Sequence, residues 1–147
     1  MIQRIQTLYV ILSMVLIGLL FAFPFAEIVE NGTIYLFDKM GISGEAGLVQ
    51  NGWPIAALIV IILLLHLVTI YSFKKRVLQM RILVFSIFLM IGLFGMFYFF
   101  TYFSFEKAHI SFKIVAVFPL VAIVLDYLAI RAIGKDEALI RSIDRIR

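Results

Sequence analysis

The chain contains no cysteine, only three prolines and few charged residues. Without cysteine it cannot form a disulfide, a thiolate zinc site or an iron–sulfur cluster, and thiol redox chemistry is excluded. Charged residues make up 15% of its 147 residues, whereas a soluble domain carries about a quarter. Apolar residues reach 64%, and the mean hydropathy is +1.11. This composition excludes a water-soluble globule and predicts a small integral membrane protein.

The sequence motifs of common enzyme and cofactor sites are also missing. No Gly-x-Ser-x-Gly elbow, His-Glu-x-x-His pair or phosphate-binding glycine loop occurs. The two histidines, His66 and His109, fall near opposite sides of the expected membrane region, which excludes haem ligation by two histidines. We therefore expect no catalytic residue, no metal ion and no other cofactor, and we do not expect an enzyme.

Four apolar stretches are long enough to cross a bilayer. A helix needs about 20 largely apolar residues to cross the hydrocarbon layer, which is roughly 30 Å thick. The stretches that meet this requirement are residues 5–26, 54–73, 82–105 and 114–133. They predict an all-α membrane protein, in which an antiparallel four-helix transmembrane bundle forms a single domain over residues 1–147.

Cations are distributed unevenly between the expected loops. The segment at residues 74–81 carries no acid and four cations, Lys74, Lys75, Arg76 and Arg81. The loop at residues 27–53 carries four acids against Lys39 alone. Because short cytoplasmic loops collect lysine and arginine, we expect this basic loop and both termini to face the cytoplasm. The acidic loop is expected on the opposite side.

The four cations of the basic loop favour a role at the membrane surface. Each cation near an anionic bilayer contributes about 1 kcal/mol of attraction, so these side chains are expected to fix topology and to contact anionic phospholipid. A nucleic-acid site would combine cations with interleaved aromatic residues on a soluble scaffold. Neither is present, so the expected partner is the lipid bilayer and not a nucleic acid.

The loop at residues 27–53 has signals of extended structure. Residues 33–37 are a β-branched and aromatic run that follows Asn31 and Gly32. Such a run after an Asn-Gly turn predicts a small β-hairpin or extended cap on the outer side of the membrane.

The segment after Gly134 has the pattern of an amphipathic helix. Gly134 is predicted to break the last membrane helix, and residues 135–147 then repeat apolar side chains at helical spacing. Such a helix anchors at a membrane surface or docks on a cytoplasmic partner. The residues expected to do so are Leu139, Arg141, Ile143, Arg145 and Ile146.

Two ionisable residues, His66 and Asp126, lie inside predicted spans. A rise of 1.5 Å per residue places both about 8 to 13 Å below the cytoplasmic surface, a level that Ser13 also reaches. Thr69 follows His66 by one turn on the same helix face. Because a charge in lipid costs on the order of 3 kcal/mol, these four residues are a candidate polar cluster. It either fixes the register of the helices or carries protons.

The two ends of the chain and the basic loop contain distinctive motifs. The chain opens with MIQRIQTLY, ends its basic loop with LQMR, and continues after the last span with LAIRAIGKDEALIRS. With these motifs it resembles, over its whole length, an uncharacterised four-span family of the Bacteroidota known as domain of unknown function 4293. The resemblance implies a multi-pass protein of the bacterial inner membrane, and it implies no activity, cofactor or catalytic residue.

Two functions remain as expectations. The lack of catalytic chemistry, together with polar termini gathered on one side, favours a non-enzymatic accessory or structural subunit of a larger inner-membrane complex. The alternative is a small proton-coupled transporter that uses Asp126 and His66. Stable co-purification with large membrane subunits would favour the first function, and proton-linked activity lost in Asp126→Asn would favour the second.

Overall fold

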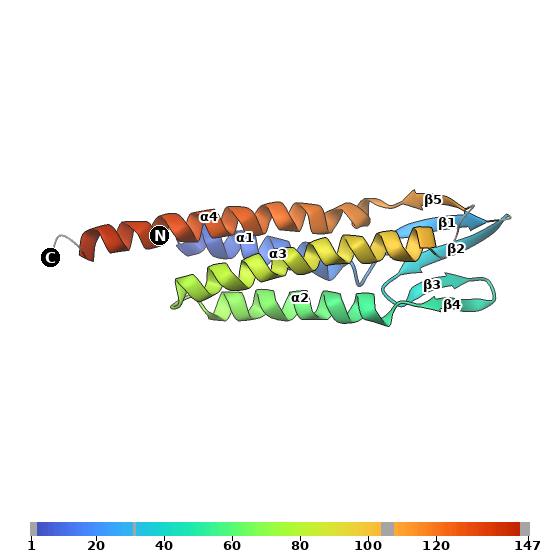
Figure 1. Cartoon of the computed structure of the whole chain (residues 1–147), viewed down its shortest axis with the longest axis horizontal. Coiled ribbons are helices and arrows are strands. Elements are labelled where there is room, and N and C mark those ends of the chain that lie inside the picture. Colours follow the sequence, from blue (N-terminus) through green and yellow to red (C-terminus); the bar gives the residue numbers. More distant parts are fainter. Residues whose placement is uncertain (1–2, 31, 104–107, 145–147) are drawn as a thin grey trace.

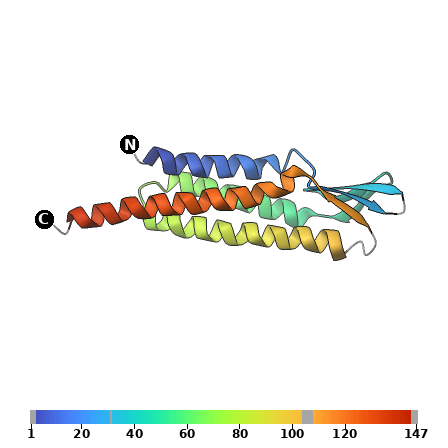
Figure 2. The same cartoon turned by 90° about the horizontal axis from the view of Figure 1, so that it is seen from above.

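The computed structural model describes residues 3–30, 32–103 and 108–144 of the chain. Over these residues, four α-helices run side by side along one axis, and a β-sheet extends from one of their ends (Figures 1 and 2). The helices are α1 (Gln3–Leu19), α2 (Trp53–Tyr71), α3 (Arg76–Tyr98) and α4 (Phe118–Asp144). A π-helical segment, Phe99–Phe103, continues α3, and a 3-10 turn, Ile114–Val117, leads into α4.

The sheet has five strands with antiparallel pairing throughout. They are β1 (Ala26–Glu30), β2 (Thr33–Asp38), β3 (Gly41–Gly44), β4 (Gly47–Asn51) and β5 (His109–Phe112), in the spatial order β4-β3-β2-β1-β5. The first four strands follow one another between α1 and α2. The fifth comes from the connection between α3 and α4 and pairs with β1, so that Ala26 faces Phe112. The sheet therefore joins two connections that are far apart in the sequence.

The prediction of an all-α four-helix bundle is wrong, because a five-stranded antiparallel sheet extends from one end of the helices (Figure 1). The loop at residues 27–53 forms four strands rather than one small hairpin. Gly41 shows why the chain can turn so tightly there, since its φ of 119° favours glycine and a Cβ at this position would lie 1.9 Å from the carbonyl oxygen of Gln50. Strands of four to six residues carry too short a pattern to stand out beside long apolar spans.

Two helix boundaries also differ from the predicted spans. Helix α1 ends at Leu19, before the predicted end of the first span, and Ala26 already belongs to β1. Helix α3 begins at Arg76, before the predicted start of the third span at residue 82. Arg76 and Arg81 are therefore helical residues, and the basic connection itself is a short turn.

Gly134 does not break the last helix, because α4 continues through it to Asp144 and extends beyond the other helices (Figure 1). Glycine inside a helix costs about 1 kcal/mol relative to alanine. Contacts on either side of Gly134 offset this cost, since Ile133 is buried and buried Asp136 accepts a hydrogen bond from Gln6 Nε2 of α1. The predicted separate tail helix is therefore the last part of α4.

Three helical segments are long and apolar enough to cross a membrane, Trp53–Tyr71, Arg76–Tyr102 and Ile114–Ile140. The apolar part of α1, Ile5–Leu19, is shorter. The outward surface of these helices is apolar, as Phe88 and Val124 illustrate with 65% and 53% of their surface exposed. A lipid environment suits such a surface, and these features indicate a membrane protein.

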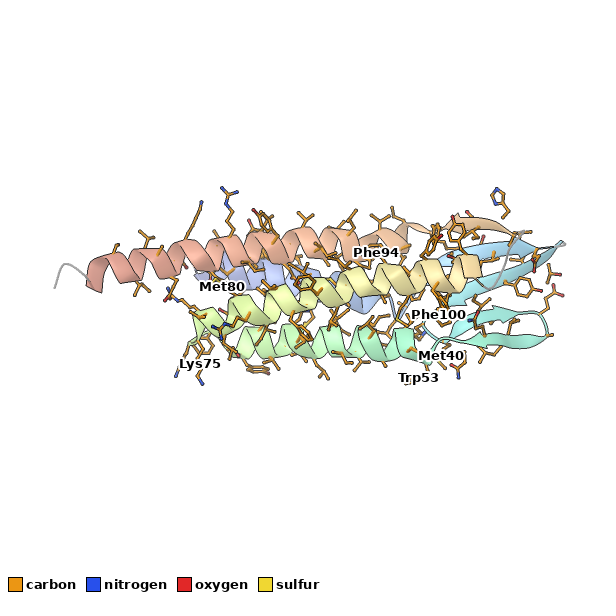
Figure 3. The ribbon with its side chains drawn as sticks, viewed as in Figure 1. Met40, Trp53, Lys75, Met80, Phe94 and Phe100 are labelled. Atoms are coloured by element: carbon orange, nitrogen blue, oxygen red, sulfur yellow. The ribbon has the colours of Figure 1, made fainter. Side chains whose placement is uncertain are left out.

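Aromatic side chains connect the sheet to the helices. The ring of Phe25, just before β1, lies 4.7 Å from that of Phe97 in α3, and Phe37 of β2 stacks on Phe100 at 5.9 Å. Figure 3 shows Phe100 beside the sheet, in the π-helical segment that continues α3. These rings fix one face of the sheet to the helical region. On the other face, Lys113 Nζ, just after β5, forms an ion pair of 2.5 Å with Glu27 of β1, which lies beside Leu36 in the register.

Candidate functional site

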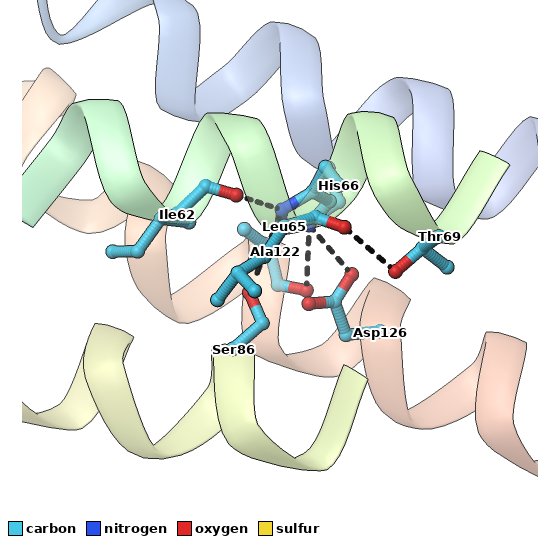
Figure 4. Close-up of polar contacts among 8 residues, drawn as sticks. Ile62, Leu65, His66, Thr69, Ser86, Ala122 and Asp126 are labelled. Carbon is cyan, nitrogen blue, oxygen red and sulfur yellow. Dashed lines mark hydrogen bonds and ion pairs between the residues drawn. The ribbon is translucent and has the colours of Figure 1, made fainter. Parts of the chain in front are cut away.

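Each helix contributes one polar side chain to a cluster inside the helical region (Figure 4). These residues, which we call the polar cluster, are Ser13 of α1, His66 of α2, Ser86 of α3 and Asp126 of α4. All four are completely buried, so no water-sized space opens onto them. The structure thus brings together three residues predicted from the sequence and one, Ser86, that the sequence analysis missed.

Helical periodicity explains why these residues face inward. The buried residues of α2 follow a spacing of three to four, with Ile59 and Ile62 preceding His66. On α4, Asp126 lies between Ala122 and Ala129, which are also buried. Small alanines allow neighbouring helices to approach closely, and α1 makes its most extensive contact with α4.

His66 is the centre of the cluster. Its Nε2 lies 3.1 Å from Asp126 Oδ1 and 2.9 Å from Ser13 Oγ. Its Nδ1 lies 2.8 Å from the carbonyl oxygen of Ile62 in the preceding turn and 3.5 Å from Ser86 Oγ. The imidazole therefore connects α2 to each of the other three helices.

One arrangement of protons satisfies all of the contacts of His66. A carbonyl oxygen only accepts, so Nδ1 of His66 donates its proton to Ile62. The Ser13 hydroxyl donates to the carbonyl oxygen of Ala122 at 3.4 Å, which leaves its oxygen free to accept from Nε2. With a proton on both ring nitrogens, an imidazolium paired with an ionised Asp126 satisfies all of these contacts.

The second oxygen of Asp126 has a different environment. Oδ2 is buried and has no hydrogen-bond partner among the described residues. A buried carboxylate oxygen without a donor is costly, and a buried ion pair is therefore weak evidence for added stability. Replacing either His66 or Asp126 should lower the stability of the fold by more than the pair itself contributes, because the remaining charge would then be buried alone.

Thr69, the fourth predicted member, lies outside the cluster. Its hydroxyl donates to the carbonyl oxygen of Leu65 in its own helix at 2.8 Å. Its carbonyl oxygen accepts a hydrogen bond of 2.9 Å from Nε2 of Gln79, a buried residue of α3. Thr69 and Gln79 therefore join α2 to α3 near their connecting turn, a contact that the sequence analysis did not identify.

The predicted basic residues gather at the end of the helices opposite the sheet. Lys74 and Lys75 are exposed in the α2–α3 turn, Arg76 is half-buried, and Arg81 is exposed on α3. Figure 3 shows Lys75 at this basic end of the molecule. Leu139 is exposed on the last part of α4, whereas the side chains of Arg141 and Ile143, and all of Arg145 and Ile146, lie outside the described residues.

The sheet presents an apolar face that the sequence analysis missed. Ile34 and Leu36 point to the same side of β2, and the register places Val29 beside Ile34. Leu36 faces Ser43, which in turn faces Leu48 of β4. Val29, Ile34, Leu36 and Leu48 are 39 to 58% exposed, and we call this surface the exposed sheet face. Its opposite face carries buried Ile28, Phe37 and Ile42.

Metal-ligating side chains do not gather in the described part of the chain. Over residues 3–30, 32–103 and 108–144, no three His, Asp or Glu residues lie close enough together to hold a metal ion. The polar cluster has one imidazole and one carboxylate, which is fewer than the three or four protein ligands of a typical zinc site.

Residues 2–146 match the model of a protein family whose description is domain of unknown function (DUF4293). No curated protein matches the chain.

Proposed function

The chain belongs to the family domain of unknown function (DUF4293), and we propose that it is a non-enzymatic accessory subunit of a larger membrane assembly. The observation that carries this proposal is the exposed sheet face. Its apolar side chains lie beyond the ends of the apolar helices, where lipid tails do not cover them. Apolar residues that cluster on such a surface are typical of a protein contact.

The charges around the exposed sheet face indicate which partner would fit. Asp38 ends β2 on the side of Ile34 and Leu36, and Glu45 lies in the exposed turn between β3 and β4. Glu27, beside Leu36 in the register, is already paired with Lys113. The Nζ of Lys39 donates to the carbonyl oxygen of Phe21 and is therefore directed toward the helices. An extramembrane partner surface with an apolar centre and a rim of lysine or arginine would complement this face.

The polar cluster supports a structural role for the helical region. Its side chains are fully buried, and His66 contacts all three neighbouring helices. Such a connection fixes one helix register and makes the helical region a rigid support for the sheet.

The membrane arrangement is part of the same proposal. We propose four spans, because α1 packs against α4 and α2 and exposes Ile5, Leu8 and Val15 on its outer side. The excess of cations at the basic end favours a cytoplasmic location for that end and for both termini, with the sheet outside. The end motifs support a bacterial inner membrane in the Bacteroidota.

Single cysteines at Glu45 and Lys74 test the orientation, since only the cysteine at position 45 should react with an impermeant reagent added from outside.

The assembly is tested by the size of the complex extracted from native membranes in mild detergent. Val29→Thr combined with Ile34→Thr makes the centre of the exposed sheet face polar and keeps β-branched residues in both strands. We expect this variant to migrate as the free chain while the unmodified protein migrates in a larger complex. Val124→Thr, a change of the same kind on the outer surface of α4, is the control and should preserve the complex. A complex that survives the sheet change would contradict the proposal.

Proton-coupled transport is the second candidate function. The observation that favours it is the Asp126 carboxylate, which contacts His66 and has one oxygen without a partner among the described residues. Asp126→Asn retains an oxygen that can accept from Nε2 but removes the charge. Proton uptake into vesicles that contain the purified protein, lost in this variant, would support transport. An unchanged native complex without proton uptake would support the accessory role.

A further inference from the structure

A pocket lies at the basic end, between the α2–α3 turn and the last part of α4. It has a volume of about 630 Å³. Its charged lining consists of one acid, Glu137, and four cations, Lys74, Lys75, Arg76 and Arg81. Like charges gather in one place only at an electrostatic cost, so this arrangement favours an anion between them.

The backbone around the pocket is held firmly. The amide of Lys75 donates to the carbonyl oxygen of Ser72 at 2.9 Å, which closes the turn. Buried Gln79 donates from Nε2 to the carbonyl oxygen of Thr69 at 2.9 Å, which fixes the start of α3 to the end of α2. The cations therefore extend from a defined framework.

The start of α3 adds to the attraction for an anion. Helix α3 begins at Arg76, and its N-cap residue, Lys75, makes no side-chain capping hydrogen bond. The first amides of a helix lack partners inside the helix and carry a partial positive charge. An anion at this position would accept hydrogen bonds from them.

An unpaired nitrogen of Arg76 independently indicates a site for an anion. Its Nη1 is buried and has no hydrogen-bond partner among the residues that the structure describes. A buried guanidinium nitrogen without an acceptor is costly, whereas a phosphate oxygen would pair with it in a favourable planar geometry. Nη1 is thus positioned for an acceptor that the described residues do not supply.

From these observations we propose that the basic pocket binds a phosphate group, with Arg76 as its main ligand. Leu78 and Ile140, which are 41% and 43% exposed, line the same pocket beside the cations. Cations next to apolar side chains match the phosphodiester and glycerol parts of an anionic phospholipid. Free inorganic phosphate has the same anionic chemistry and is the other possible source. The proposal does not depend on the accessory role.

The test uses the full-length protein in detergent and compares Arg76→Gln with Arg131→Gln. Arg131 is exposed on α4, away from this pocket, so its variant removes the same charge from the same end of the molecule. Binding of phosphatidylglycerol is measured by native mass spectrometry, with phosphatidylcholine as the neutral lipid. Because a charge-assisted hydrogen bond is lost, we expect on the order of tenfold weaker phosphatidylglycerol binding in Arg76→Gln and little change in Arg131→Gln.

Further measurements separate the two sources and control for folding. Inorganic phosphate that displaces phosphatidylglycerol from the unmodified protein would support a phosphate site open to free anions. Phosphatidylglycerol binding that inorganic phosphate does not displace would support a lipid site. Arg76→Lys keeps the charge and should bind more tightly than Arg76→Gln, while circular dichroism shows whether both remain helical. Equal losses in Arg76→Gln and Arg131→Gln, or equal binding of the two lipids, would overturn the proposal.

Discussion

The helical region and the sheet distribute polar and apolar side chains in opposite ways. In the helical region the exposed side chains include Phe88 and Val124, while His66 and Asp126 are fully buried. In the sheet, one face buries Phe37 against the helices, and the other exposes Ile34 beside Val29. Lipid explains the apolar surface of the helices. The apolar surface of the sheet lies outside the helices and therefore needs a different explanation, and we propose a protein partner.

The two regions are also held together in different ways. Hydrogen bonds and an ion pair connect the helices through the polar cluster, whereas packed aromatic rings connect the sheet to α3. Polar contacts are specific but sensitive to the loss of a single partner. Aromatic packing is spread over several rings, so its loss is more gradual.

The largest effect is expected in the helical region, from His66→Leu. This change leaves the Asp126 charge buried without its partner, which should lower the free energy of unfolding by about 3 to 5 kcal/mol. Unfolding in a mixed detergent series measures the loss. The double variant His66→Leu with Asp126→Asn should recover part of it, because no charge then remains. Equal losses in the single and double variants would show that the pair contributes no specific coupling.

A smaller effect is expected in the sheet, from Gly41→Ala. The new Cβ would meet the backbone of Gln50 and Gly52 in a residue with a φ of 119°, so we expect a loss of about 2 kcal/mol or more. The damage should stay in the sheet and appear as faster proteolysis between α1 and α2, with the helices still inserted. Gly47→Ala is the matched control, since its φ of 113° is equally unfavourable for alanine but its Cβ would meet no atom within 4 Å. If both variants are cleaved at the same rate, the close approach at Gly41 is unimportant.

The smallest effect is expected at Gly134, and it has the opposite sign. A Cβ there would meet only Met80 Sδ, at an ordinary contact distance of 3.8 Å. Gly134→Ala should therefore stabilise α4 by about 0.5 to 1 kcal/mol through its helix propensity. Thermal unfolding followed by circular dichroism measures this change. A decrease in stability would mean that the helix bends or ends at Gly134, as its sequence pattern predicts.

The helical region was largely predictable from the sequence, whereas the sheet was not. Length and apolar composition located the long helices, and counting residues from the basic end placed His66 and Asp126 at one depth. Ser86 could not be recognised, because a hydroxyl in an apolar helix can also bond to its own backbone. The pairing of β1 with β5 depends on residues as distant as Ala26 and Phe112, and no local pattern encodes it. Gln6 and Asp136 likewise meet only because α1 packs against α4.

The exposed sheet face could have been suspected from one signal. Residues 33–37 contain both Ile34 and Leu36 at alternating positions, next to Tyr35 and Phe37 on the other side. A strand with large apolar residues on both faces is expected when both faces are covered. In this structure one face is covered by helices, and the second face is the surface that we assign to a partner.

The most direct test of this account is site-specific photocrosslinking in native membranes. A photoreactive amino acid at Ile34 reports on the exposed sheet face, and the same amino acid at Val124 reports on the outer surface of α4. The account predicts protein adducts of defined mass at Ile34, which Val29→Thr suppresses, and lipid adducts at Val124. Protein adducts at Val124 with none at Ile34 would show that the helices carry the interaction, and would contradict the role assigned to the sheet.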